Sequence, residues 1–207
     1  MSDDLLKKLS GIQKDALKEI GNVGAGNAAT AFAQFLECKI NMTVPSVSIM
    51  PISDVPEITG GIEKKIVSVL LKVLGEAPGS ILLLFSEDSC ENLLELILNE
   101  KYNINDFREV EISAIKEIGN ILSGSYLNAI NHMTGLNLFQ SLPAFSYDMA
   151  GAILSSSMIT LSLQSDYALL IETTFINGNS EIEGYFFLMP DPGSLEKILG
   201  GLGFDTE

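Results

Sequence analysis

Two identical pentapeptides carry the side chains whose types and spacing could do chemistry in this chain. Lys-Glu-Ile-Gly-Asn occupies residues 18–22 and returns unchanged at residues 116–120, 98 positions later. A carboxylate precedes a carboxamide by three residues in each copy: Glu19 before Asn22, and Glu117 before Asn120. The carboxylate can pair with a cation, whereas the carboxamide both donates and accepts hydrogen bonds and can hold a water molecule in one orientation.

Helical periodicity surrounds both copies and decides which side chains share a face. At about 100° per residue, the polar residues of the first copy fall on one side of a helix and the apolar residues on the other. The polar faces consist of Asp15, Lys18, Glu19 and Asn22, and of Ser113, Lys116, Glu117 and Asn120. The apolar faces consist of Leu17, Ile20 and Gly24, and of Ile115, Ile118 and Leu122. Each copy therefore predicts an amphipathic helix that presents a carboxylate and a carboxamide one turn apart.

Capping boxes predict where these two helices begin. Ser10-Gly-Ile-Gln13 and Asp106-Phe-Arg-Glu109 both have the required spacing. We therefore expect long helices over residues 10–36 and 107–133, the second ending before Gly135. The glycine-rich run at residues 21–26 lacks the order of a phosphate-binding fingerprint and follows no strand, so we expect it to allow close helix packing.

An ordinary solvated helix face is the alternative explanation of the Glu/Asn pairs. Two observations favour a function. Asparagine is a poor residue inside a helix, yet it occurs there twice. The pair is also retained in both copies, although the intervening Val23-Gly-Ala25 has become Ile121-Leu-Ser123.

The remaining segments recur in the same order, which indicates an internal duplication. Each half has a helix, a strand broken by proline, a hairpin and a closing helix. In the first half, we expect the broken strand at residues 39–50, a loop at 51–61, the hairpin at 66–74 and 80–85, and the closing helix at 87–98. In the second half, we expect the broken strand at residues 136–147, the hairpin at 164–175 and 184–189, and the closing helix at 192–199. The sequence predicts an α+β fold, in which a mainly antiparallel sheet carries long helices. We expect a single compact domain over residues 1–207, made of two pseudo-two-fold repeats at about 10–99 and 107–203.

An inserted segment distinguishes the second half. Residues 79–84 align with 184–189 at an offset of 105, so about seven residues have been added after Pro143. The segment beginning at Asp148 has helical character, and we expect Asp148 to cap a helix whose apolar positions include Met149, Ile153 and Leu154. This helix either covers the core or also forms a docking surface.

Composition excludes several classes of function. The formal net charge of −15 disfavours nucleic-acid binding and favours a partner with a basic rim. Two cysteines, Cys38 and Cys90, are too few for a disulfide scaffold or a zinc site, and His132 has no catalytic neighbours in the pattern. We expect no membrane span, no signal peptide, a cytoplasmic location, and no metal or other cofactor of the protein's own.

The complete motif resembles that of a known family. It comprises an acid or hydroxyl, three residues, Glu, two residues, Asn, twenty-two residues and Pro. The two copies are Asp15, Glu19, Asn22 and Pro45, and Ser113, Glu117, Asn120 and Pro143. This pattern resembles the CheC family of chemotaxis phosphatases, which includes CheX and FliY, and the resemblance covers about residues 9–203. Two intact motifs disfavour a CheX-like architecture, and the lack of a further domain after Phe204 disfavours a FliY-like switch component.

The resemblance implies a phosphatase that acts on phosphorylated CheY, abbreviated CheY-P. In this family the asparagines orient the attacking water and the glutamates pair with a lysine of the receiver domain, which also supplies the phosphoaspartate and Mg²⁺. The resemblance makes Pro45 and Pro143 structural and leaves the role of Asp15 and Ser113 open. The alternative is a non-enzymatic adaptor that binds a receiver domain or the receptor deamidase CheD, with Asp148 as a candidate contact. We expect a monomer or a heterodimer with CheD.

Overall fold

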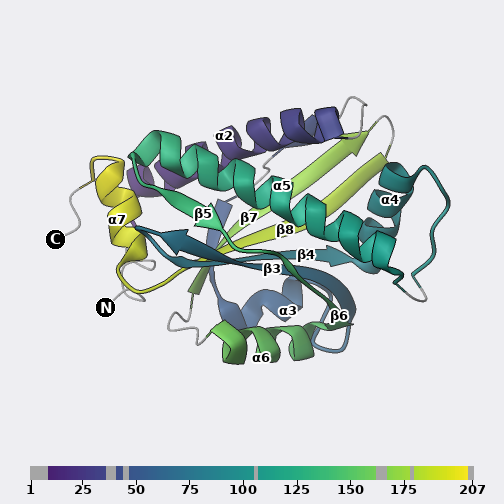
Figure 1. The fold of residues 1–207 in the computed structure, drawn as a ribbon. Coiled ribbons are helices and arrows are strands. Elements are labelled where there is room, and N and C mark those ends of the chain that lie inside the picture. Colours follow the sequence, from purple (N-terminus) through teal and green to yellow (C-terminus); the bar gives the residue numbers. More distant parts are fainter. Residues whose placement is uncertain are drawn as a thin grey trace.

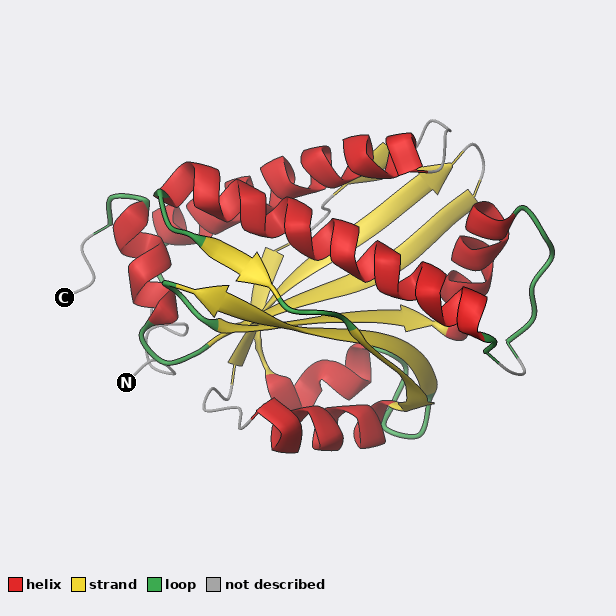
Figure 2. Ribbon diagram, in the orientation of Figure 1, coloured by secondary structure: helices red, strands yellow, loops and turns green. Residues whose placement is uncertain are grey.

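The fold is built on one antiparallel β-sheet, as Figures 1 and 2 show. The computed structural model describes residues 9–35, 41–43, 47–104, 107–161, 167–177 and 180–204. Within these residues eight strands form the sheet: β1 (Asn41–Thr43), β2 (Val47–Pro51), β3 (Lys65–Gly75), β4 (Gly79–Ser86), β5 (Leu138–Gln140), β6 (Ala144–Met149), β7 (Tyr167–Asn177) and β8 (Ser180–Pro190). The order is β1-β7-β8-β4-β3-β5; β2 also pairs with β7, and β6 with β3. The predicted α+β class with an antiparallel sheet is confirmed.

The two halves of the chain share this sheet rather than forming one sheet each. Strand β4 of the first half pairs with β8 of the second, and Leu82 lies opposite Phe187, its own counterpart at the offset of 105. The pseudo-two-fold axis of the duplication therefore passes between these two residues. The halves also exchange their broken strands, because β1 and β2 pair with β7 whereas β5 and β6 pair with β3.

Helices cover both faces of the sheet (Figure 1). One face carries α2 (Gly11–Phe35) and α5 (Glu109–Thr134), with α4 (Glu87–Leu98) and α7 (Ser194–Gly201) at its ends. The other face carries α3 (Val55–Ile58) and α6 (Ala150–Leu161), and a short 3₁₀ turn, η1 (Ile52–Asp54), precedes α3. Each face buries its own apolar cluster, and the larger one lies beneath α2 and α5. No helix in the described ranges is both long and apolar enough to cross a lipid bilayer.

Glycine allows α2 and α5 to approach each other closely. A Cβ built on Gly24 would lie 2.3 Å from Cδ1 of Tyr126, so any larger residue would collide with the buried ring. That ring in turn packs on Phe186, with the ring centroids 4.3 Å apart. The predicted packing role of the glycine-rich run is confirmed at this position.

The predicted start of the first long helix is confirmed, whereas that of the second is wrong. Ser10 and Gln13 form a reciprocal capping box: Ser10 N donates to Oε1 of Gln13 at 2.9 Å, and Gln13 N donates to Oγ of Ser10 at 3.3 Å. Helix α5 begins two residues later than the second predicted box, with Arg108 as its N-cap. Glu111 binds the guanidinium of Arg108 there, and Asp106 lies outside the described residues.

Two further local predictions are corrected by the structure. Residues 51–61 were expected to be a loop, but η1 and α3 form there because Ile52 and Val55 bury against the second face of the sheet. Asp148 does not cap α6, since it lies in β6. The first N–H groups of α6 donate instead to backbone carbonyls, from Ala150 to Lys64 and from Gly151 to Ile62.

The inserted helix otherwise covers the core as predicted. Ile153 and Leu154 are buried in the apolar cluster of the second face. Met149, expected on the same helical face, lies in β6 instead and is 45% exposed.

Of the two motif prolines, the structure describes only Pro143. Pro143 is half-buried and lies in the break between β5 and β6. Pro45 lies outside the described residues, as does Cys38. Cys90 is buried in the core, as expected for a structural thiol, and burial raises its pKa to about 12.

Candidate functional site

The Glu/Asn motifs form two polar surfaces on the outer sides of α2 and α5. Asp15, Glu19 and Asn22 are exposed on α2, and Ser113 and Glu117 are exposed on α5, where Asn120 is half-buried. The opposite sides of both helices are buried against the sheet, through Leu17, Ile20, Ile115, Ile118 and Leu122. The structure thus brings each Glu/Asn pair onto one helical face, as the 3.6-residue period predicts.

The glutamates of both motifs have no partner within the described part of the chain. Glu19, Asn22 and Glu117 make no hydrogen bond or ion pair there, although Lys18 and Lys116 are their neighbours in sequence. Among the same residues, no cluster of histidine, cysteine or acidic side chains could hold a metal ion. Each motif therefore presents a glutamate carboxylate that is unpaired among the described residues.

The second site contains a residue that the motif does not include. Gln140, at the end of β5, donates from Nε2 to Oδ1 of Asn120 at 3.1 Å. At the repeat offset of 98 the first half has Met42 in place of Gln140. This difference between the halves is visible in the sequence, but nothing in the sequence places residue 140 beside residue 120.

An open cleft of about 270 Å³ lies along α2, and none of Asp15, Glu19 and Asn22 lines it. It is lined by Lys14, Leu17, Ser48, Ile49 and Leu169, between α2 and the β2–β7 pair. In the second half, Tyr147 corresponds to Ile49. The ring of Tyr147 packs edge-on against that of Phe107, with the two ring centroids 5.1 Å apart. The surroundings of the two motifs therefore differ, although the motifs themselves match.

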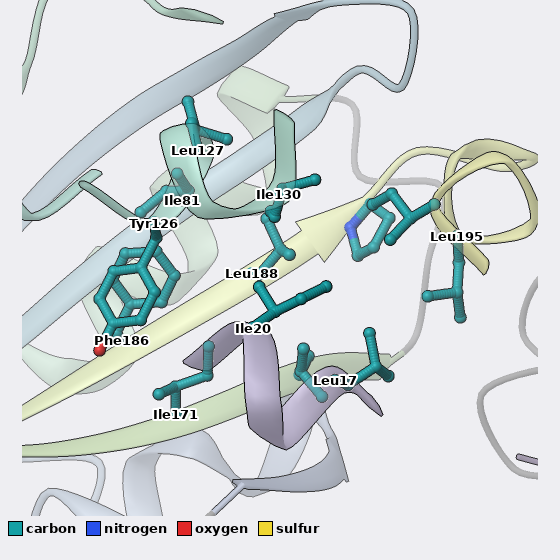
Figure 3. Close-up of a pocket in the computed structure, with 13 residues that line it drawn as sticks. Leu17, Ile20, Ile81, Tyr126, Leu127, Ile130, Ile171, Phe186, Leu188 and Leu195 are labelled. Atoms are coloured by element: carbon teal, nitrogen blue, oxygen red, sulfur yellow. The ribbon is translucent and has the colours of Figure 1, made fainter. Parts of the chain in front are cut away.

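A small apolar cavity lies in the core beneath the two long helices (Figure 3). Its volume is about 20 Å³, which is room for about one water molecule. Its lining is aliphatic and aromatic, and the hydroxyl of Tyr126 points to Thr173, 3.3 Å away. Burial raises the pKa of Tyr126 to about 12, so the ring stays neutral at physiological pH. This cavity is a gap in packing and offers no group for catalysis.

Comparison with known proteins identifies the family. The CheC-like family model matches residues 12–49 and 110–147, two segments that differ by the repeat offset and contain both motifs. The CheY-P phosphatase CheC of Bacillus subtilis is 36% identical over 196 residues, which cover 92% of this chain and 94% of that protein. The flagellar motor switch phosphatase FliY of the same organism is 29% identical over 119 residues, covering 56% of this chain and 31% of that protein.

Solved structures agree with the fold. FliY of Thermotoga maritima superposes with a TM-score of 0.76 at 18% identity, covering 95% of this chain and 98% of that one. The FliM middle domain of H. pylori superposes with a TM-score of 0.71 at 12% identity, covering 93% and 99%. The extent of the sequence match to the B. subtilis protein, together with two matched motif segments, shows that this chain belongs to the CheC-like family.

Proposed function

We propose that this protein is a CheY-P phosphatase, which hydrolyses the phosphoaspartate of the chemotaxis response regulator CheY. The B. subtilis relative with 36% identity over nearly the whole chain is a CheY-P phosphatase, and FliY of that organism is a phosphatase as well. The observation that carries the proposal is the duplicated Glu/Asn pair, which lies on the outer side of both long helices with Asn120 half-buried and the other three side chains exposed.

The residues of this chain can complete a site that the receiver domain has in part. Hydrolysis of an aspartyl phosphate needs a water molecule held in line with the phosphorus. The carboxamide of Asn22 or Asn120 can accept a hydrogen bond from that water and donate one to a phosphoryl oxygen. The carboxylate of Glu19 or Glu117 can pair with the receiver's lysine and fix the register of the complex. The phosphorylated aspartate and a Mg²⁺ ion belong to the partner in this scheme, so this chain needs no cofactor of its own.

Replacement of both asparagines tests the proposal. In the variant Asn22→Ala/Asn120→Ala, the phosphoaspartate lifetime of CheY should return to its value in the absence of this protein. Because neither side chain belongs to the core, the free energy of unfolding should change by about 1 kcal/mol or less. A matched control is Asn27→Ala/Asn128→Ala, which removes exposed asparagines of the same two helices outside the motif. Full activity in the motif variant, or equal losses in both variants, would contradict the proposed chemistry.

Binding of CheD is a second proposal, and Asp148 is its candidate contact. Asp148 is exposed at the end of β6, next to Met149, which is 45% exposed. Ile62, 62% exposed, lies against Gly151 at the start of α6, so a carboxylate and two apolar side chains occupy one edge of the molecule. Mixed polar and apolar composition of this kind suits a protein interface.

Charge reversal separates this adaptor role from the phosphatase role. Asp148→Lys should weaken CheD binding in a titration while leaving CheY-P hydrolysis without CheD unchanged, since the residue is on neither long helix. Asp191→Lys reverses another exposed carboxylate and serves as the control. Normal CheD binding by Asp148→Lys would show that Asp148 is not part of the CheD interface.

A further inference from the structure

The carboxamide of Asn120 is held by a second carboxamide, that of Gln140. Nε2 of Gln140 lies 3.1 Å from Oδ1 of Asn120 and 3.5 Å from the backbone carbonyl of the same residue. One lone pair of Oδ1 is thereby engaged, which fixes the rotation of the amide about its terminal bond. The other lone pair and both protons on Nδ2 remain available to a ligand.

The strand that carries Gln140 is itself fixed to the helix that carries Asn120. Asn131 of α5 donates from Nδ2 to the carbonyl of Leu138 at 2.8 Å, and its Oδ1 accepts from Leu138 N at 2.9 Å. Leu138 and Gln140 are two residues apart in β5, so both face α5. The backbone of Gln140 also pairs with Val73 in β3. The glutamine therefore reaches Asn120 from a short strand that is anchored on both sides.

A glycine makes room for this contact. Gly124 lies one helical turn after Asn120, and a Cβ built on it would be 3.1 Å from Nε2 of Gln140. The glutamine amide thus lies over the bare backbone of α5 at Gly124, beside Asn120. At Gly26, the corresponding glycine of α2, a built Cβ meets no described atom within 4 Å.

The first half has a different residue at the position of the donor. Met42 occupies the position that corresponds to Gln140, and a thioether has no proton to donate. Asn22 is accordingly exposed with no partner in the described residues, whereas Asn120 is half-buried. We propose that Gln140 is a positioning residue that pre-orients the Asn120 carboxamide for catalysis, so that the two sites of this protein turn over at different rates; this inference rests on the proposed phosphatase function.

The physical reason is the breadth of the terminal torsion of asparagine. An unrestrained carboxamide rotates over a broad, two-fold profile about its last bond, so it is often turned with the wrong atom toward the substrate. A hydrogen bond from Gln140 removes that freedom before CheY-P arrives, which favours a near-attack arrangement of the water. Since Gln140 is not required to touch the partner, its loss should lower turnover and leave the affinity for CheY-P unchanged.

The test uses the background Asn22→Ala, in which only the second site acts. There, Gln140→Met gives the second half the residue of the first and keeps the side-chain volume similar. A net neutral hydrogen bond is worth about 0.5–1.5 kcal/mol, so kcat for CheY-P hydrolysis should fall by about two- to tenfold. KM, and the affinity for CheY activated with beryllofluoride, should stay constant. Equal kcat, or a raised KM at constant kcat, would overturn the positioning role.

Two further measurements keep failure of this inference distinct from failure of the phosphatase function. Asn120→Ala in the same background should abolish hydrolysis; if it does not, the proposed function of the second site is wrong. The amide pairing needs no partner protein to be observed, because hydrogen-bonded Nε2 protons of Gln140 exchange more slowly in an NMR experiment than those of an exposed glutamine such as Gln34. Slow exchange that becomes fast in Asn120→Ala supports the pairing, and exchange as fast as that of Gln34 contradicts it.

Discussion

Gly124 of α5 lies under the side-chain amide of Gln140, where an added Cβ would be 3.1 Å from Nε2 and would push the amide away by a few tenths of an ångström. The variant Gly124→Ala should therefore shift the Gln140 amide and weaken its hydrogen bond to Asn120 while both residues remain present. We expect CheY-P turnover by the second site, measured with Asn22→Ala in the background, to fall by about two- to tenfold, as for the loss of one neutral hydrogen bond.

Gly26→Ala is the matched control for this substitution. It adds the same methyl group at the corresponding position of α2, where it meets no described neighbour. Phosphatase activity of the first site, measured with Asn120→Ala in the background, should be unchanged. Alanine is the better helix former, so the free energy of unfolding should rise by up to about 1 kcal/mol. A similar loss of turnover in both glycine variants would show that the effect arises from the helices and not from Gln140.

Gly24→Ala should destabilise the fold despite this gain in helix propensity. Its Cβ would lie 2.3 Å from Cδ1 and 2.8 Å from Cε1 of Tyr126, a ring that is 1% exposed and cannot move aside. Overpacking of this kind costs about 1–3 kcal/mol, measurable as a lower midpoint in urea denaturation. An unchanged midpoint would mean that α2 and α5 can separate without cost.

The affinity for CheY-P should depend on salt through the two motif glutamates. The net charge is −15, and neither glutamate has a partner among the described residues. If each pairs with a lysine of the receiver, binding should weaken as ionic strength rises from about 0.01 to 0.15 M, where the Debye length falls from about 30 to about 8 Å. In Glu19→Gln/Glu117→Gln, binding should be weaker and its dependence on salt flatter. An unchanged slope would mean that these carboxylates face no cation.

Acid should destabilise the start of α5 through Glu111. This carboxylate is fully buried and accepts a hydrogen bond from Nε of Arg108 at 2.7 Å, whereas the arginine side chain is 65% exposed. That hydrogen bond, opposed by burial, lowers the pKa of Glu111 below its usual value. The folded state therefore binds this proton less tightly than the unfolded chain does. The resulting stabilisation is present above the unfolded pKa of about 4.3 and is lost as pH falls through the folded pKa.

The variant Glu111→Gln isolates this contribution. It should lower the free energy of unfolding at pH 7 by about 1 kcal/mol or less, as for an ion pair with one solvent-exposed partner. Thermal unfolding between pH 7 and pH 3 should then show a shallower acid limb than in the unchanged protein. If the stability of both proteins falls equally steeply between pH 7 and pH 3, the pH dependence arises from other carboxylates.

Local sequence determined the elements that need only neighbouring residues. The faces of α2 and α5 follow from a 3.6-residue period, and the box of Ser10 and Gln13 from two side chains three residues apart. Helix α4 and the β3–β4 hairpin also lie where the apolar pattern predicted them. The second capping box was wrong, because α5 begins at Glu109 with Arg108 as its N-cap and no side-chain capping hydrogen bond, and Arg108 instead pairs with the carboxylate of Glu111. Such a choice between adjacent registers depends on which side chain the core buries.

Long-range packing decided what the pattern of residues left open. The duplication indicated two similar halves, but it carries no information on which half a strand joins, because backbone hydrogen bonds are the same for either partner. Only the assembled sheet pairs β5 and β6 with β3 of the other half, and β5 lies between that strand and α5, where Gln140 reaches Asn120. The sequence by itself determined two matching Glu/Asn faces. The tertiary structure made them unequal, since the carboxamide of Asn120 accepts a hydrogen bond from a strand residue 20 positions away, whereas that of Asn22 has no partner among the described residues.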